Sequence, residues 1–215
     1  MSLTPIESFP HAELWIEIFT DDDPENPREW DNAGRMVCWH RRYNLGDTHA
    51  FAVPAEFNEW WAEHGEGVLL FPLYLYDHSG ITISMAPFSC PWDSGQVGYH
   101  CITAAKIKEE WGEVPDAAGQ TPQQRAESCL RAETETYDRY LQGEVYGYTV
   151  SRDSVGSDGL RSYRDESESC WGFFGLEYCR QEARAAAEGI TRRASAAAAK
   201  VDQAAPRRKL RAITP

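Results

Sequence analysis

The chain alternates short apolar runs with polar turns, and the spacing of the apolar residues predicts both strands and helices. Residues 12–19 alternate apolar and polar side chains, which is typical of a half-buried strand. Residues 68–76 are almost uniformly apolar, which predicts a central strand buried on both faces, with a bulge or an edge contact at Pro72. Further strands are predicted at 36–40, 80–86, 96–103, 144–150 and 169–175.

Helical spacing of apolar residues marks four other segments. The clearest is 122–142, where Thr121 is a good N-cap, Pro122 suits the first turn and Gln124 completes a capping box. The other helices are predicted at 54–65, 104–112 and 176–188, and polar loops are predicted at 21–34 and 153–168.

The order of these elements predicts the fold class. Short connections between strands favour antiparallel pairing, and the helices come in separate blocks. We therefore expect an α+β fold in which helices pack on one face of a mainly antiparallel sheet. One domain is expected over residues 1–189. Residues 190–215 are rich in alanine and then basic, which predicts a weak helical extension that ends in a flexible tail.

Composition narrows the setting of the protein. The 215 residues are enough to bury a core without disulfides, and the six cysteines include no CxxC pair, so reduced structural thiols are expected. The first residues lack the basic and apolar regions of a secretory signal, and no segment approaches the roughly 18 apolar residues of a membrane span. We expect a cytoplasmic protein with no membrane partner.

Charge is distributed unevenly along the chain. The net charge is −13, and because residues 190–215 carry +6, residues 1–189 carry −19. An acidic body repels nucleic acid and favours basic partners, so Asp21, Asp22 and Asp23 in the densest acidic run are candidate partner contacts. The alternatives are a role in solubility alone, or internal pairing of this run with Arg41 and Arg42. The basic tail could touch nucleic acid only weakly, through phosphate contacts.

Polar and aromatic side chains gather at three predicted strand ends. His40 and Arg41 follow one strand and lead to Asp47, while Asp77 and His78 follow the next. Loops at strand ends often carry function, so we expect these segments and the turn that follows to share one cleft at one edge of the sheet. A ligand-binding loop is the preferred functional interpretation of that turn, and a purely structural turn is the alternative. The candidate residues of the turn are Trp92, Asp93 and Gln96.

Metal binding is a weaker interpretation of the same region. Cys38 and His40 would share one face of a strand, as two metal ligands do. A closed zinc site needs four ligands, however, and the adjacent side chains of His100 and Cys101 would point to opposite faces. No metal and no cofactor are predicted.

Hydrolytic chemistry is kept as an alternative function. Asp77, His78 and Ser79 are the residue types of a hydrolase triad, but triads assemble in space and the chain has no GxSxG elbow. A nucleophilic Cys90 would need a nearby base. If the protein is an enzyme, we expect a small hydrolase or ligand-degrading enzyme whose site lies near Asp77, His78, Asp93 and His40.

Five blocks of sequence resemble, in the same order, a family of uncharacterised proteins encoded by bacteriophages and other mobile elements. The resemblance covers about Trp15 to Gly175. It implies an accessory binding protein that acts on a host protein, such as an inhibitor that presents an acidic surface to a basic, nucleic-acid-binding defence component, or that acts on a small ligand. The blocks are CWHRRYNLGD (38–47), LYLYDHSG (73–80), PFSCPWDSGQVG (87–98), GEVYGY (143–148) and SCWGFFG (169–175).

Overall fold

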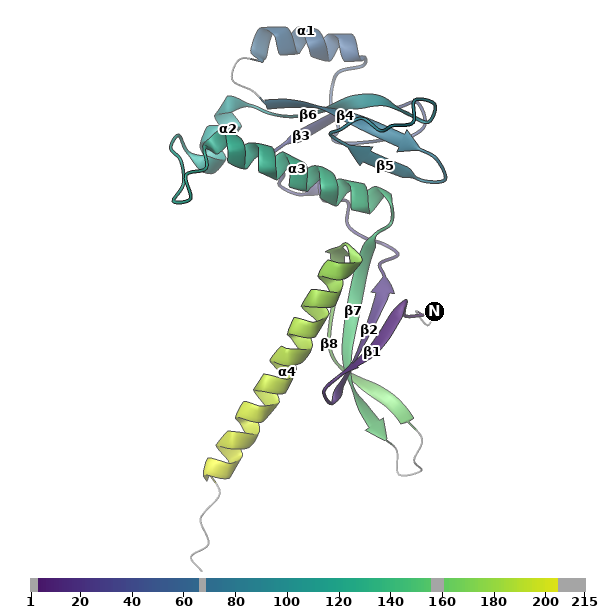
Figure 1. The fold of residues 1–215 in the computed structure, drawn as a ribbon, viewed down its shortest axis with the longest axis vertical. Helices are drawn as coiled ribbons and strands as arrows, with labels where there is room; N and C mark the ends of the chain where they lie inside the picture. Colours follow the sequence, from purple (N-terminus) through teal and green to yellow (C-terminus); the bar gives the residue numbers. More distant parts are fainter. Residues whose placement is uncertain (1–3, 66–68, 156–160, 205–215) are drawn as a thin grey trace, which may run out of the picture. The chain divides into compact units, whose positions relative to one another are not determined.

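The computed structural model describes residues 4–65, 69–155 and 161–204 (Figure 1). The fold is α+β, as expected, with helices and two antiparallel sheets. The chain divides into two compact units. Unit 1 consists of residues 1–20 and 146–215, and unit 2 consists of residues 21–145. The single domain expected over 1–189 spans both units.

Unit 1 is a four-stranded sheet in the order β1-β2-β7-β8, with helix α4 packed on one face. Strand β2 pairs antiparallel with β7, from Leu14 opposite Arg152 to Thr20 opposite Tyr146. The elements are β1 (Glu7–His11), β2 (Leu14–Thr20), β7 (Val145–Val155), β8 (Arg161–Phe174) and α4 (Leu176–Ala204).

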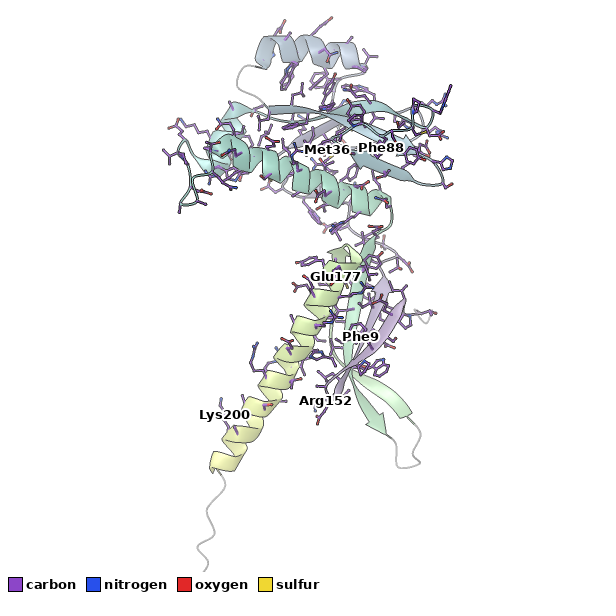
Figure 2. All side chains as sticks on the ribbon, in the orientation of Figure 1. Phe9, Met36, Phe88, Arg152, Glu177 and Lys200 are labelled. Atoms are coloured by element: carbon purple, nitrogen blue, oxygen red, sulfur yellow. The ribbon has the colours of Figure 1, made fainter. Side chains whose placement is uncertain are left out.

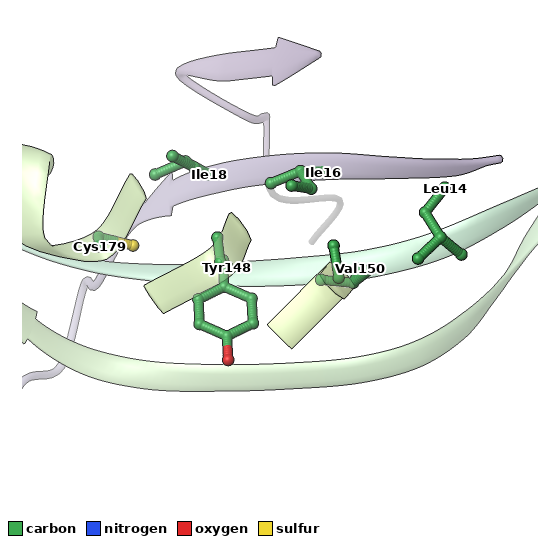
Figure 3. Close-up of a cluster of buried hydrophobic side chains, with 8 residues drawn as sticks. Leu14, Ile16, Ile18, Tyr148, Val150 and Cys179 are labelled. Atoms are coloured by element: carbon green, nitrogen blue, oxygen red, sulfur yellow. The ribbon is translucent and has the colours of Figure 1, made fainter. Parts of the chain in front are cut away.

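The core of unit 1 follows directly from the alternating pattern of β2. Its even-numbered residues point to α4, where small side chains allow the helix to approach the sheet closely (Figure 3). Phe9 packs against the same cluster, and the Arg184 guanidinium lies 5.4 Å from the centre of its ring. The fully buried members of the cluster include Ile16, Ile18, Val150, Cys179, Ala183 and Ala187.

Two predictions for unit 1 need correction. Strand β1 was not predicted, because Pro10 is unusual in strands and is tolerated here at the edge of the sheet. The polar loop predicted at 153–168 is wrong over 153–155 and 161–168, since β7 continues to Val155 and β8 begins at Arg161, and its remaining part lies outside the described residues. Helix α4 continues past 188 to Ala204, which confirms the predicted helical extension. Residues 191–197 are exposed, and the exposed Lys200 lies near the far end of the helix in Figure 2. The tail predicted beyond 204 lies outside the described residues.

Unit 2 is a second antiparallel sheet, in the order β3-β6-β4-β5. Strand β4 is central, as predicted, and the register shifts between Leu73 and Tyr74, next to Pro72, which confirms the expected bulge. The elements are η1 (Pro27–Glu29), β3 (Arg35–Cys38), α1 (Pro54–His64), β4 (Leu69–Asp77), β5 (Ile81–Ser84), β6 (Ser94–Ile102), α2 (Ala104–Trp111) and α3 (Pro122–Leu141).

Helices cover both faces of this sheet, whereas one covered face was predicted. Phe57 of α1 packs on Val37 and Cys101 on one face. Leu130 of α3 packs with Ile102 on the other face, where α2 joins the same cluster. The physical reason is that the strands carry apolar residues at both parities, so both faces need cover.

Helix α3 begins and ends as the sequence predicts. The Thr121 hydroxyl accepts from the Gln124 backbone N–H, and the Gln124 side chain accepts from the Thr121 backbone N–H, which forms the expected capping box. Near its C-terminus, Asp138 accepts from the Thr82 hydroxyl (2.6 Å) and the Ile83 backbone N–H (2.8 Å), which ties the helix to edge strand β5. In the described part of the chain, none of the helices has the length and apolarity to cross a bilayer.

Candidate functional site

The structure brings most of the predicted site residues together where β4 ends and β6 begins. We call this site the strand-end cleft. It has a volume of about 440 Å³. The Asp77 backbone N–H donates to the Asp93 carbonyl (2.8 Å), which holds the two turns side by side, and Trp92 is 91% exposed. The predicted residues that line the cleft are His40, Arg41, Asp77, Trp92, Asp93 and Gln96.

One side of the strand-end cleft is organised around Asp77. The Arg42 guanidinium forms an ion pair with its carboxylate, and the Tyr43 hydroxyl donates to Oδ1 (3.2 Å). The His40 ring stacks on Tyr43 with its centroid 4.9 Å away, and its Nδ1 accepts from the backbone N–H groups of Arg42 (3.3 Å) and Tyr43 (3.2 Å). In the neutral ring the proton therefore sits on Nε2.

Asp93, on the other side of the cleft, pairs with His78, which is not among the residues that line the cleft. His78 Nδ1 lies 3.3 Å from Asp93 Oδ2, with side chains 63% and 41% exposed. The Cys90 Sγ lies 3.8 Å from the same oxygen. A carboxylate that orients an imidazole can support proton transfer, and here the pair is open to water.

The acidic run lies apart from this cleft. Asp22 and Asp23 are exposed, and Asp21 is half-buried with its carboxylate accepting from the Asp23 backbone N–H (3.2 Å). Among the described residues, no ion pair joins this run to Arg41 or Arg42, and Arg42 pairs with Asp77 instead. Internal neutralisation of the run by these two arginines, which the sequence left open, is therefore absent from the described contacts.

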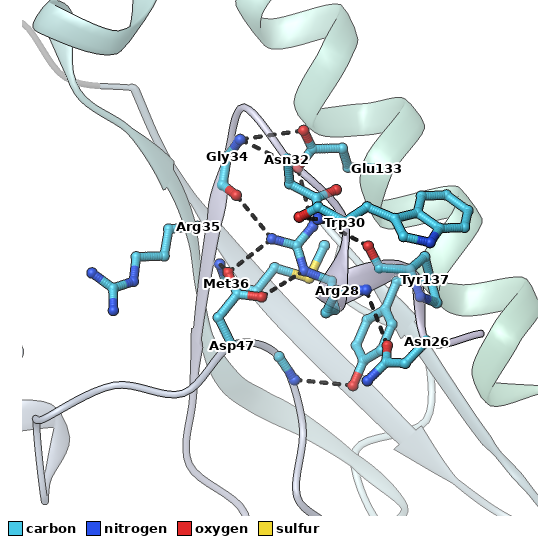
Figure 4. Close-up of polar contacts among 12 residues, drawn as sticks. Asn26, Arg28, Trp30, Asn32, Gly34, Arg35, Met36, Asp47, Glu133 and Tyr137 are labelled. Atoms are coloured by element: carbon cyan, nitrogen blue, oxygen red, sulfur yellow. Dashed lines mark hydrogen bonds and ion pairs between the residues drawn. The ribbon is translucent and has the colours of Figure 1, made fainter.

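A buried arginine that the sequence analysis did not select organises the opposite end of β3. The Arg28 side chain is only 2% exposed. Its Nε and Nη2 donate to the two Asp47 carboxylate oxygens (both 2.8 Å), Nη2 also donates to the Gly34 carbonyl (2.8 Å), and Nη1 donates to Glu133 (3.1 Å) (Figure 4). This two-point pairing matches the planar fork of a guanidinium to a carboxylate.

Asp47 therefore has a different role from the predicted one. It was grouped with Arg41 as a candidate ligand contact, but it does not line the strand-end cleft. Its Oδ2 accepts from the Met36 backbone N–H (2.8 Å) as well as from Arg28. A carboxylate with this many internal donors is committed to the structure of the loop.

Glu133 on α3 closes the network from the other side. It accepts from the backbone N–H groups of Ala33 (2.8 Å) and Gly34 (3.2 Å) and lies 3.1 Å from His100 Nε2. Burial alone would raise the pKa of Glu133, but the bonds from His100, Arg28 and Gly34 outweigh it and lower the pKa to about 2. Burial lowers the pKa of His100, against the opposing effect of Glu133.

The cysteines are free thiols, and the described residues form no metal-binding group. All six cysteines are free, and burial raises the pKa of Cys38 to about 12 and of Cys101 to about 11, which keeps both as thiols at neutral pH. Within the described residues, no group of three or more His, Cys, Asp or Glu side chains is placed to hold a metal ion.

Comparison with known proteins adds no assignment. No family model, curated protein or solved structure matches this chain.

Proposed function

We propose that this protein is an accessory binding protein of a phage or mobile element, and that its acidic unit 2 engages a basic surface of a host protein in the cytoplasm. The observation that carries the proposal is the division of charge between the units. Residues 21–145 hold 22 Asp or Glu and 9 Lys or Arg, a net charge of −13. The rest of the chain holds 12 of each and is neutral.

The acidic loop, defined here as residues 21–31, supports the proposal through its rigidity. Arg28 anchors it from within, the Asn26 side chain accepts from the Arg28 backbone N–H (3.0 Å), and the Asn32 side chain donates to the Pro27 carbonyl (2.9 Å). Charges on an ordered loop lose little conformational freedom on binding and steer association. The carboxylates left exposed are those of Asp22, Asp23, Glu25, Glu29 and Asp31.

The test compares two charge-matched variants in capture from a bacterial host lysate. Asp22→Asn with Asp23→Asn removes two exposed charges from the acidic loop, and Glu59→Gln with Glu63→Gln removes two from the exposed side of α1. We expect the loop variant to lose a partner that the wild type and the α1 variant retain. Retention should also fall as salt rises from 0.05 M to 0.5 M, because salt screens exposed charges (the Debye length is about 10 Å at 0.1 M).

Two results would count against this proposal. Equal capture by the wild type and the loop variant would return the loop to a role in solubility. Equal loss in both variants would mean that overall charge, and not the ordered loop, makes the contact. Matching thermal unfolding curves for the three proteins serve as the folding control.

A second candidate function is hydrolysis in the strand-end cleft. The paired His78 and Asp93, which lie beside Asp77 and His40, favour it. The test is turnover of p-nitrophenyl acetate and p-nitrophenyl phosphate by the wild type, by His78→Asn and by the control His64→Asn, an exposed histidine on α1. Turnover lost only in His78→Asn would support catalysis, and turnover equal in all three proteins would exclude a role for His78.

A further inference from the structure

A second cavity, of about 460 Å³, opens on the α1 side of the unit 2 sheet, away from the strand-end cleft. Four aromatic rings line it: Trp30, Phe51, Phe57 and Trp60. We propose that this ring-lined cavity binds a small planar aromatic molecule that carries one anionic group. The inference goes beyond the partner surface because it concerns a small ligand, and the two sites share Trp30 and Asp31 of the acidic loop.

Three of these rings form a continuous wall. Phe51 meets Phe57 edge-on with centroids 5.3 Å apart, and it lies 5.7 Å from the Trp60 ring. Phe57 is only 1% exposed and contacts both, while Trp30, which also lines the cavity, is 42% exposed. Aromatic faces stack with planar groups, and the volume falls within the range of about 300–1,000 Å³ that is usual for ligand sites.

Basic side chains are more frequent around the cavity than in the rest of its unit. Three of the nine basic residues of unit 2 line it, against two of its 22 acidic residues. The basic residues are Arg28, Arg35 and Lys106, and the acidic ones are Asp31 and Asp47. Arg28 and Lys106 are each paired with carboxylates, so the attraction for an anion rests on Arg35.

Arg35 is the basic group best placed to receive that anion. Arg28 is engaged by Asp47 and Glu133, and the Lys106 amine lies 2.7 Å from Glu110. Arg35 is exposed, takes part in none of the described ion pairs, and uses one N–H to bond the Thr48 carbonyl (3.0 Å). Its remaining donors form a planar fork of the kind that binds carboxylate or phosphate.

Calorimetric titration of the full chain tests both halves of the proposed ligand. The ring–anion probes are adenosine 5′-monophosphate and indole-3-acetate, and the half-probes are adenosine and ribose 5-phosphate. We expect at least one ring–anion probe to bind. If adenosine 5′-monophosphate binds, adenosine and ribose 5-phosphate should each bind about tenfold more weakly than the nucleotide does. Arg35→Gln should weaken the ring–anion probe about tenfold, whereas Arg41→Gln, which removes the same charge at the strand-end cleft, should not.

A matched pair of tryptophan variants tests the stacking wall. Trp30→Leu should weaken the probe that binds, and Trp92→Leu, an exposed tryptophan at the strand-end cleft, should leave it unchanged. Failure of both ring–anion probes to saturate the protein overturns the proposal, and so does an equal effect of Arg35→Gln and Arg41→Gln. If Arg35→Gln lowers the melting temperature, Arg35→Lys replaces it, because the charge is kept and only the fork is lost.

Discussion

Replacing Arg28 by methionine would test whether this one side chain holds the acidic loop against α3. The change keeps most of the apolar stem and removes every guanidinium bond. It leaves Asp47 and Glu133, whose side chains are 18% and 11% exposed, without their shared cation. Removing one partner of a buried ion pair costs about 3–5 kcal/mol, so we expect the free energy of unfolding of unit 2 to fall by that amount.

The pKa of Glu133 adds a pH dependence to this effect. It falls from 4.5 to about 2 in the folded protein, and the bonds that lower it, from His100, Arg28 and the Gly34 N–H, stabilise the folded state. Because the folded pKa is the lower one, this stabilisation is present above about pH 4.5 and is lost as the pH falls toward 2. Without Arg28 the pKa of Glu133 should rise, so the difference between the wild type and Arg28→Met should narrow in acid.

Urea unfolding followed by tryptophan fluorescence measures the effect. Six of the eight tryptophans lie in residues 21–145, so the signal reports mainly on unit 2. Lys108→Met is the control. Lys108 lies 2.6 Å from Glu113, closer than Arg28 lies to its partners, but the two side chains are 65% and 70% exposed, and exposed ion pairs contribute about 0–1 kcal/mol to stability. Arg28→Lys should recover only part of the loss, since lysine lacks the fork. A loss below about 1 kcal/mol in Arg28→Met, or one that stays constant down to pH 3, would refute the reasoning.

Three further predictions concern packing and the ends of the elements. Gly34→Ala should destabilise unit 2 by about 1–3 kcal/mol in urea unfolding, because the added Cβ would collide with Leu130 and His100; Gly95→Ala, where the Cβ meets nothing within 4 Å, is the control. Asp138→Ala should cost about 1–3 kcal/mol by the same measurement, because it leaves the Ile83 N–H without its acceptor, and a matching effect of the exposed Glu135→Ala would contradict this. Ending the chain after Ser195 should leave the melting temperature unchanged, whereas ending it after Gly189 also removes the partly buried Ile190 and should lower the temperature by about 2–4 °C.

Local signals made much of the fold predictable. The capping box at Thr121 and the uniform apolar run of β4 each depend on residues that are close together in the sequence. Helix α3 and strand β4 therefore lie where they were predicted. The polar segment 161–168 gave no such signal. It belongs to an edge strand, which backbone pairing with β7 holds in place, and the side-chain pattern does not report that pairing.

The site divides in the same way. His40, Asp77 and Asp93 could be placed together because each sits at the end of a strand. The antiparallel pairing of β6 with both β3 and β4 brings those ends together. Arg28 lies among Pro, Asn and Asp and has the appearance of a surface residue, while its partner Glu133 is 105 residues away. No local pattern encodes a contact of that separation. The one available hint is Glu133 itself, a charge on the apolar side of α3 three residues after the buried Leu130.

The pairing of β2 with β7 gives the two units unequal roles during synthesis. The first and last residues of unit 2 are in contact, because the Asp21 N–H donates to the Val145 carbonyl (2.8 Å). Next to them, Thr20 lies opposite Tyr146. An unfolded stretch of 125 residues would make this closure cost on the order of 4 kcal/mol in chain entropy. Once unit 2 has folded, its two ends hold β2 beside β7. The pairing of these two strands can then start at Thr20 and Tyr146, and the rest of the unit 1 sheet can form from there. Destabilising substitutions in unit 2 should therefore slow the folding of unit 1. Destabilising substitutions in unit 1 should not change the folding rate of unit 2, because residues 146–215 are synthesised after it.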